Sequence, residues 1–142
     1  MITLDWKKGR AFEVIPPSGI RFTLDAYPES GGQDLGPTPM EALLASLAAC
    51  SAMDVINILE KKRLPVTGYR LEVDGERGPE GIYPRPYTSI TLRHVVEGDG
   101  IDPGAVEQAV RLSDEKYCSV AATLRFGPEI RTEVRVELPA VA

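Results

Sequence analysis

The sequence is poor in residues that bind metal ions. Among its 142 residues it has two cysteines, Cys50 and Cys118, and one histidine, His94. None of these forms the closely spaced pairs that zinc sites use. We therefore predict neither a metal ion nor a cofactor.

Long basic and long apolar segments are also missing. The net charge is −5, and the longest basic stretch is Lys61-Lys62-Arg63, which excludes a nucleic-acid partner because phosphate neutralisation needs a basic patch. No apolar signal segment follows Met1, and the apolar run 40–53 is too short to span a bilayer. We expect a cytoplasmic protein without membrane contact, where a disulfide is more often catalytic or sensing than structural.

The composition is that of a globular protein, with 43% hydrophobic and 26% charged residues. No repeat or linker divides the chain, so we predict one α+β domain over residues 1–142. Apolar and polar residues alternate as in half-buried strands. The predicted strands are 2–8, 11–15, 20–25, 69–74, 87–96 and 129–138.

A long central helix is predicted between the two groups of strands. Thr38 suits its N-cap and Pro39 its first position, and Glu41 completes a capping box. The helix extends to about Lys62. Because residues 40–53 are apolar on nearly all sides, we expect a buried helix, partly covered by a second subunit.

Two shorter helices are predicted in the C-terminal half. One begins after Asp102 with a proline at its first position. The other runs from Cys118 to Leu124 and ends at Gly127. Both cysteines therefore lie in helical contexts rather than in a CxxC motif.

The residues near the two cysteines do not decide whether the thiols are inert or form a redox pair. Spacing alone favours two inert core cysteines over a redox pair assembled by folding. Cys50 lies in mid-helix among alanines, with Asp54 one turn later on the same face. Cys118 opens a helix, where free amides favour a thiolate, so local physics makes it the more acidic thiol.

Other charged residues are weaker candidates. The capping box explains Glu41 without any active-site role, and His94 is most simply a strand residue whose ring has hydrogen-bond partners. Several arginines in turns, strands or loops could reach the central helix; these are Arg10, Arg21, Arg77 and Arg85.

Two runs of sequence resemble the motifs of one family. The run from Gly36 to Val55 resembles the central-helix motif of the OsmC/Ohr superfamily, and the run from Glu115 to Ala121 resembles its second-cysteine motif. The residues of these two runs are most similar to those of the YhfA-like branch. The resemblance implies antiparallel sheets around a long buried central helix, in an intertwined homodimer.

The resemblance also implies an activity. Characterised members are oxidoreductases that reduce organic hydroperoxides as an antioxidant response to oxidative stress. By analogy Cys50 is the peroxidatic cysteine, which becomes a sulfenic acid, and Cys118 is the resolving cysteine, which condenses with it to a disulfide. A dithiol, a lipoylated protein in some members, restores the thiols. This assignment reverses the ranking by local acidity.

The activating groups depart from the family pattern. Ohr-type motifs place glutamate directly after the proline, where this chain has Met40, so the acid is Glu41 or Asp54. The arginine candidates are Arg10, Arg21 and Arg85. We predict a thiol peroxidase acting on organic hydroperoxides, and on hydrogen peroxide as a further substrate. The alternatives are a dimer that binds a small hydrophobic molecule without catalysis, and a redox sensor.

Overall fold

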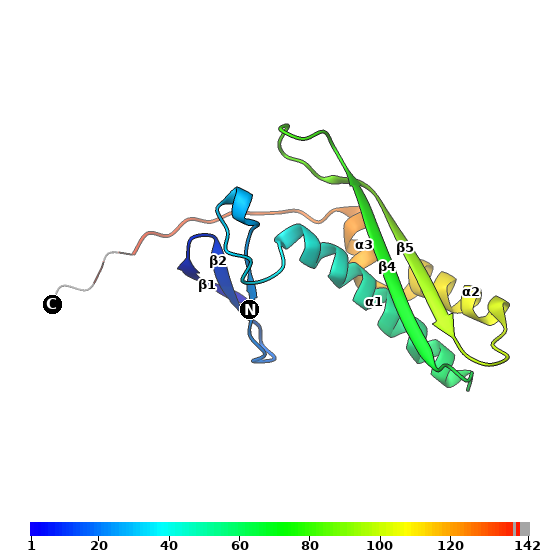
Figure 1. Ribbon diagram of the computed structural model, residues 1–142. Coiled ribbons are helices and arrows are strands. Elements are labelled where there is room, and N and C mark those ends of the chain that lie inside the picture. The colour runs from blue at the N-terminus through cyan, green and yellow to red at the C-terminus, as the bar shows by residue number, and fades with distance from the viewer. Residues whose placement is uncertain (138, 140–142) are drawn as a thin grey trace.

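The computed structural model describes residues 1–137 and Pro139, and Figure 1 shows their arrangement. The elements form a three-stranded sheet, a long helix, a two-stranded hairpin and a C-terminal helical region. In chain order they are β1 (Thr3–Lys8), β2 (Ala11–Ile15), β3 (Phe22–Leu24), η1 (Pro28–Ser30), α1 (Pro39–Lys61), β4 (Gly68–Arg77), β5 (Tyr87–Glu97), α2 (Pro103–Leu112), η2 (Ser113–Tyr117) and α3 (Ser119–Phe126).

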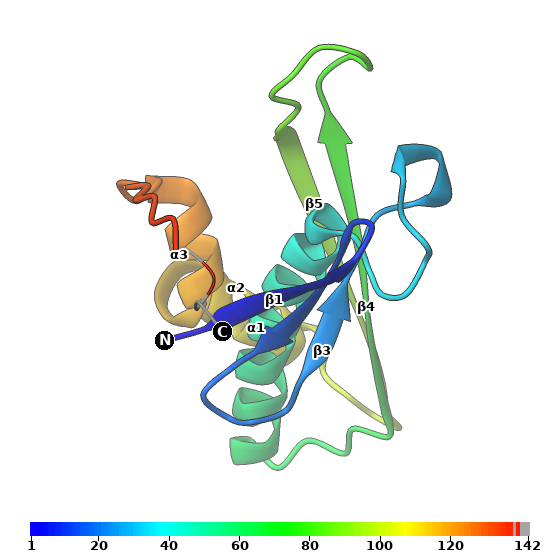
Figure 2. The same cartoon turned by 90° about the vertical axis from the view of Figure 1, so that its left-hand side faces the viewer.

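Both sheets are antiparallel, which confirms the predicted mixed α+β class. Strands β1, β2 and β3 form a meander at one end of the molecule, while β4 and β5 form a long hairpin beside α1 (Figures 1 and 2). Five of the six predicted strands are present. The third is shorter than predicted, and the fourth continues to Arg77 because its alternation extends into the hairpin.

Helix α1 begins where its capping residues predict. The Thr38 side chain accepts a hydrogen bond from the Glu41 amide at 3.1 Å, and Glu41 Oε1 accepts one from the Thr38 amide at 2.8 Å. This reciprocal pair satisfies two amides that a helix start leaves free. The helix has 23 residues and ends at Lys61.

The expectation that α1 is buried on nearly all sides is wrong for a single chain. One stripe at four-residue spacing faces the core; it consists of Leu47, Ser51, Val55 and Leu59. The opposite stripe is exposed and includes Ala45, Ala49, Met53 and Asn57. The reason is geometric, because the hairpin and the C-terminal helices of one chain cover only one side of α1 (Figure 2).

Helix α1 ends within one residue of the predicted Lys62. By length and composition alone the whole helix could cross a membrane, whereas the apolar run 40–53 within it is too short to do so. Its packing against β4, α2 and α3 is that of a core helix in a folded domain.

The core consists of two small clusters along α1. One cluster joins Leu47 to Cys118 and Ala121, with Cys50 packed against it. The other joins Val55 and Leu59 to Ala109, Val106 and Val110 of α2, together with residues of the hairpin. Both cysteines therefore belong to the first cluster.

The C-terminal region differs from the prediction in two ways. Helix α3 begins at Ser119 and ends at Phe126, two residues later than expected, with Cys118 as its N-cap. The predicted strand 129–138 is wrong for residues 129–137, which form no strand, and Leu138 lies outside the described residues. No strand among the described residues pairs with this segment, and Ile130 and Val134 are each 86% exposed.

Candidate redox site

The two thiols come together although they lie 68 positions apart in the sequence. The Sγ atoms of Cys50 and Cys118 and a carboxylate oxygen of Asp54 all lie within 4.8 Å of one another. Cys50 and Asp54 project from the same face of α1, and Cys118 approaches from the start of α3. The structure therefore places the thiols as a pair rather than in separate parts of the core.

Burial dominates the environment of Cys118. The residue is 4% exposed, and its Sγ accepts a hydrogen bond from the Ala121 amide at 3.4 Å. Loss of hydration raises the pKa of the Cys118 thiol, the Ala121 amide opposes this rise, and the neighbouring Cys50 and Asp54 add to it. The expectation that the helix start favours the Cys118 thiolate is not met, because one amide does not offset the burial.

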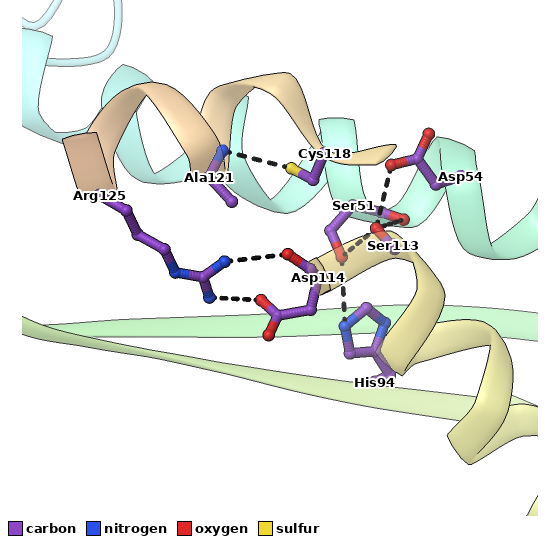
Figure 3. A network of polar contacts seen from close by, with 8 residues as sticks. All are labelled: Ser51, Asp54, His94, Ser113, Asp114, Cys118, Ala121 and Arg125. Atoms are coloured by element: carbon purple, nitrogen blue, oxygen red, sulfur yellow. Dashed lines mark hydrogen bonds and ion pairs between the residues drawn. The ribbon is translucent and has the colours of Figure 1, made fainter. Parts of the chain in front are cut away.

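Asp54 is held by a buried serine. Ser113, which is fully buried, donates a hydrogen bond from its hydroxyl to Asp54 Oδ2 at 3.0 Å. The same hydroxyl lies 3.3 Å from Ser51 Oγ, and Ser51 Oγ lies 3.5 Å from Nε2 of His94 (Figure 3). A continuous set of polar contacts thus connects the acid beside the thiols to strand β5.

The sequence reasoning missed both serines. Serine in a helix most often faces solvent, so neither residue was recognised as a buried polar residue. Ser51 could have been found from its position, since it falls on the four-residue stripe of α1 that is otherwise made of Leu47, Val55 and Leu59. No local pattern marks Ser113, because it lies where the helical spacing is interrupted by η2.

His94 and Tyr69 complete the polar contacts on the sheet side. The Tyr69 hydroxyl lies 2.5 Å from Nδ1 of His94, so both ring nitrogens have partners, as predicted. Burial lowers the pKa of His94, against an opposing effect of Asp114, and burial raises the pKa of Tyr69 to about 12. Both side chains are therefore uncharged at neutral pH.

Glu41 lies away from the thiols within the chain. It precedes Cys50 by nine residues, which is about 13 Å along a helix. Besides its part in the capping box, it accepts a hydrogen bond from the Tyr27 hydroxyl at 2.9 Å. The Thr38 amide, and then Tyr27, lower the pKa of Glu41.

The three candidate arginines are also held elsewhere. Arg21 pairs with Glu13 at 3.1 Å on the N-terminal sheet. Arg10 donates to the carbonyl of its neighbour Gly9, and Arg85 donates to the Gly78 carbonyl in the β4–β5 loop. Within the described chain, none of the three contacts the thiols.

A cavity of about 810 Å³ opens beside Cys118. Its apolar walls come from α1, β5, α2 and α3, and include Leu47, Ile90, Leu92, Val106, Val110, Ala121 and Leu124. Arg111 and Arg125 also line it, and Arg125 donates to Asp114 Oδ1 at 2.6 Å (Figure 3). Sequence analysis had not considered either arginine, since both lie on ordinary helical turns.

Comparisons with known proteins agree with this fold. The OsmC family model, described as OsmC-like protein, matches residues 31–133. The chain belongs to this OsmC-like family, as the two cysteine motifs had suggested. It is 40% identical over 119 residues to protein YhfA of Escherichia coli, which covers 84% of each chain.

Solved structures of other proteins have the same fold. A hypothetical protein from Aquifex aeolicus has a TM-score of 0.75 and 34% identity, covering 89% of this chain and 87% of that one. An organic hydroperoxide resistance protein OsmC from Legionella pneumophila has a TM-score of 0.63 over 89% of this chain and 90% of that one. At 17% identity, the second comparison establishes the fold alone.

Proposed function

We propose that this protein is a cysteine-based peroxidase that reduces organic hydroperoxides. The observation that supports it is that the Sγ atoms of Cys50 and Cys118 lie within 4.8 Å of each other, and that Cys118 lines a cavity with partly aliphatic walls. Relatives in fold that are named organic hydroperoxide resistance proteins support the same chemistry. The greater burial of Cys118 favours Cys50, which is half-buried, as the thiol that meets substrate.

The reaction requires three steps. The Cys50 thiolate attacks the terminal oxygen of the hydroperoxide; the O–O bond breaks, the alkoxide takes a proton and leaves as alcohol, and Cys50 becomes a sulfenic acid. The Cys118 sulfur then attacks the Cys50 sulfur, which releases water and forms the disulfide. A dithiol supplies two electrons and two protons to regenerate both thiols, and is itself oxidised to a disulfide.

The cavity favours organic hydroperoxides over hydrogen peroxide. Aliphatic side chains form part of the wall beside Cys118, so the cavity can receive an alkyl group. Arg111 and Arg125 line the same cavity together with the acids Glu107 and Asp114, and Arg125, which pairs with Asp114, is the cation we assign to stabilising the leaving alkoxide. This assignment replaces Arg10, Arg21 and Arg85 in our proposal.

We further propose that the protein functions as a homodimer. The exposed stripe of α1 includes Met53, which is 68% exposed, and the apolar side chains of Ile130 and Val136 are 86% and 82% exposed. Trp6 on β1 is also 66% exposed. A second copy could bury these surfaces, since obligate dimer interfaces resemble a core cut in half.

The cavity also favours a second candidate, a protein that binds a small hydrophobic molecule without turning it over. Its volume is in the range of small-molecule sites. A co-purifying apolar ligand in a protein that is inert to peroxide would support this candidate.

The experiment is a stopped-flow assay with cumene hydroperoxide and a dithiol reductant. The wild type should turn over, Cys50→Ser should not, and Ser46→Ala, an exposed change on the same helix, should match the wild type. Cys118→Ser should retain one fast turnover and accumulate a sulfenic acid that dimedone traps. If the wild type is no faster than Cys50→Ser, the peroxidase proposal is wrong.

A further inference from the structure

We propose that Cys50, Asp54 and Cys118 form a binding site for a soft divalent cation, Zn²⁺ or Cd²⁺. No such site is expected from the sequence, because its few soft ligands are far apart in the chain. Folding brings two thiols and a carboxylate to within 4.8 Å of one another. This property depends on the reduced thiols and not on any peroxidase activity.

The spacing of the ligands suits a metal. Cys50 and Asp54 stand at positions i and i+4 of α1, a spacing that lets two ligands of one helix reach the same ion. Zinc binds sulfur at about 2.3 Å and carboxylate oxygen at about 2.0–2.2 Å, so its tetrahedral ligands lie about 3.5–3.8 Å apart. Side-chain rotations that close the site by about 1 Å are enough.

Two hydrogen bonds from neighbouring residues orient the ligands. Ser113 donates to Asp54 at 3.0 Å, and the Ala121 amide donates to Cys118 Sγ at 3.4 Å. Such outer contacts orient metal ligands and keep their lone pairs directed at the ion. Both donors lie in residues 113–121, so one segment of the chain orients a ligand from α1 and the ligand that precedes α3.

The ligand chemistry selects the class of ion. Two thiolates favour zinc and cadmium and disfavour magnesium and calcium, which require oxygen ligands. Among the described residues, no fourth histidine, cysteine or acid joins the cluster. A water molecule therefore completes the tetrahedron, and this exchangeable position makes the site accessible to metal.

Metal binding and disulfide formation exclude each other. Each uses the same two sulfur atoms, and a disulfide retains no thiolate to bind the ion. Diamide, which takes two electrons and two protons from a thiol pair, should release the bound metal as it forms the Cys50–Cys118 disulfide. Conversely, bound zinc should protect both thiols from alkylation.

The experiment titrates the reduced full-length protein with Co²⁺ and records the thiolate-to-cobalt charge-transfer band. We expect one ion per chain, displacement by Zn²⁺, and release by diamide. Cys50→Ser and Cys118→Ser should lose the band. Asp54→Asn should weaken binding about tenfold or more, and Ser113→Ala about tenfold, in line with losses at supporting residues.

Asp99→Asn is the matched control, since Asp99 is an exposed acid outside the cluster. It should bind cobalt like the wild type, and circular dichroism should confirm that every variant is folded. The proposal is overturned if the wild type gives no band, or if Asp54→Asn and Ser113→Ala both bind with wild-type affinity. Protection of the wild-type thiols by zinc tests the site without any substitution.

Discussion

The hydroxyl of Ser113 donates a hydrogen bond to Oδ2 of Asp54 across 3.0 Å. Ser113 opens η2, the π-helical turn that separates α2 from Cys118, whereas Asp54 belongs to α1. The amide of Cys118 in turn donates to the Ser113 carbonyl at 2.8 Å. One residue thus fixes both the acid and the backbone that carries the second thiol.

Removing that hydroxyl should destabilise the fold. Ser113→Ala leaves Asp54 without its buried donor, and we expect the free energy of unfolding to fall by about 1–3 kcal/mol. Urea denaturation measures the change. Ser119→Ala, an exposed serine at the start of α3, should alter stability by less than about 0.5 kcal/mol. Equal stability of the two variants would contradict the role assigned to Ser113.

The Cys118 thiol should react slowly at ordinary pH. In Cys50→Ser, burial still raises the pKa of Cys118, so alkylation by iodoacetamide should rise only above the ordinary thiol value of 9.0. The unfolded variant in urea serves as the control and should react at lower pH. Because the folded state favours the neutral thiol, its contribution to stability is present below the unfolded pKa and is lost as pH rises through the folded pKa. A folded protein that reacts like the unfolded one would contradict this prediction.

Glu41 should act as a helix cap and not as a catalytic acid. Glutamine at this position retains the capping box but loses the charge. We therefore expect Glu41→Gln to lower the unfolding midpoint slightly, because glutamine has one acceptor oxygen for the Thr38 amide and the Tyr27 hydroxyl, and to keep a peroxidase rate within about twofold of wild type. Thr38→Ala, which removes the cap, should cost about 1 kcal/mol. A loss of activity in Glu41→Gln of about a hundredfold, without a loss of stability, would assign the acid to catalysis.

Asp25 should stabilise the loop that leads into α1. It is 2% exposed and accepts hydrogen bonds from the amides of Ala26, Gln33 and Leu35 at 2.7, 3.0 and 3.2 Å. These amides, with Ala26 first, lower the pKa of Asp25. Its contribution is therefore present above the ordinary value of 3.8 and is lost as pH falls through the folded pKa.

Asp25→Asn tests this pH dependence. The variant should unfold at lower urea concentration than the wild type at pH 7, and the difference should shrink near pH 3. Asp34→Asn is the control, because Asp34 lies in the same loop but is exposed, and asparagine tolerates its positive φ of 53°. A difference between Asp25→Asn and wild type that does not depend on pH would contradict the assignment.

The oligomeric state should depend on the exposed stripe of α1. Met53→Glu places a charge where we propose that a second copy packs, so light scattering after size exclusion should show a shift toward monomer. Thr91→Glu adds the same charge on the exposed face of β5 and should leave the dimer intact. A wild type that is monomeric at all concentrations tested would contradict the proposed dimer.

The local elements could be predicted because short-range rules fix them. The start of α1 depends on Thr38 and Glu41, three residues apart, and the strands of the hairpin follow from simple alternation. The resemblance of the two cysteine runs to one family gave the fold class, which the structure and the comparisons confirm.

The remaining features depend on contacts that no local pattern encodes. The pKa of Cys118 is raised, where its helix position predicts a lowered one, because α1 and α3 bury the thiol. The segment 129–137 has the apolar and polar alternation of a strand, but this pattern does not determine which strand the segment pairs with. Ser113 gains its partner only when η2 places it opposite α1.

Ser51 has a consequence for where the first thiol points. Aliphatic packing against the core limits the rotation of a helix about its axis through shape alone. Ser51 adds a directional constraint, since its oxygen must stay within hydrogen-bonding distance of the Ser113 hydroxyl. Cys50 is the preceding residue, about 100° around the helix. The rotation of α1 that keeps the Ser51 hydrogen bond therefore also fixes the direction of the Cys50 side chain.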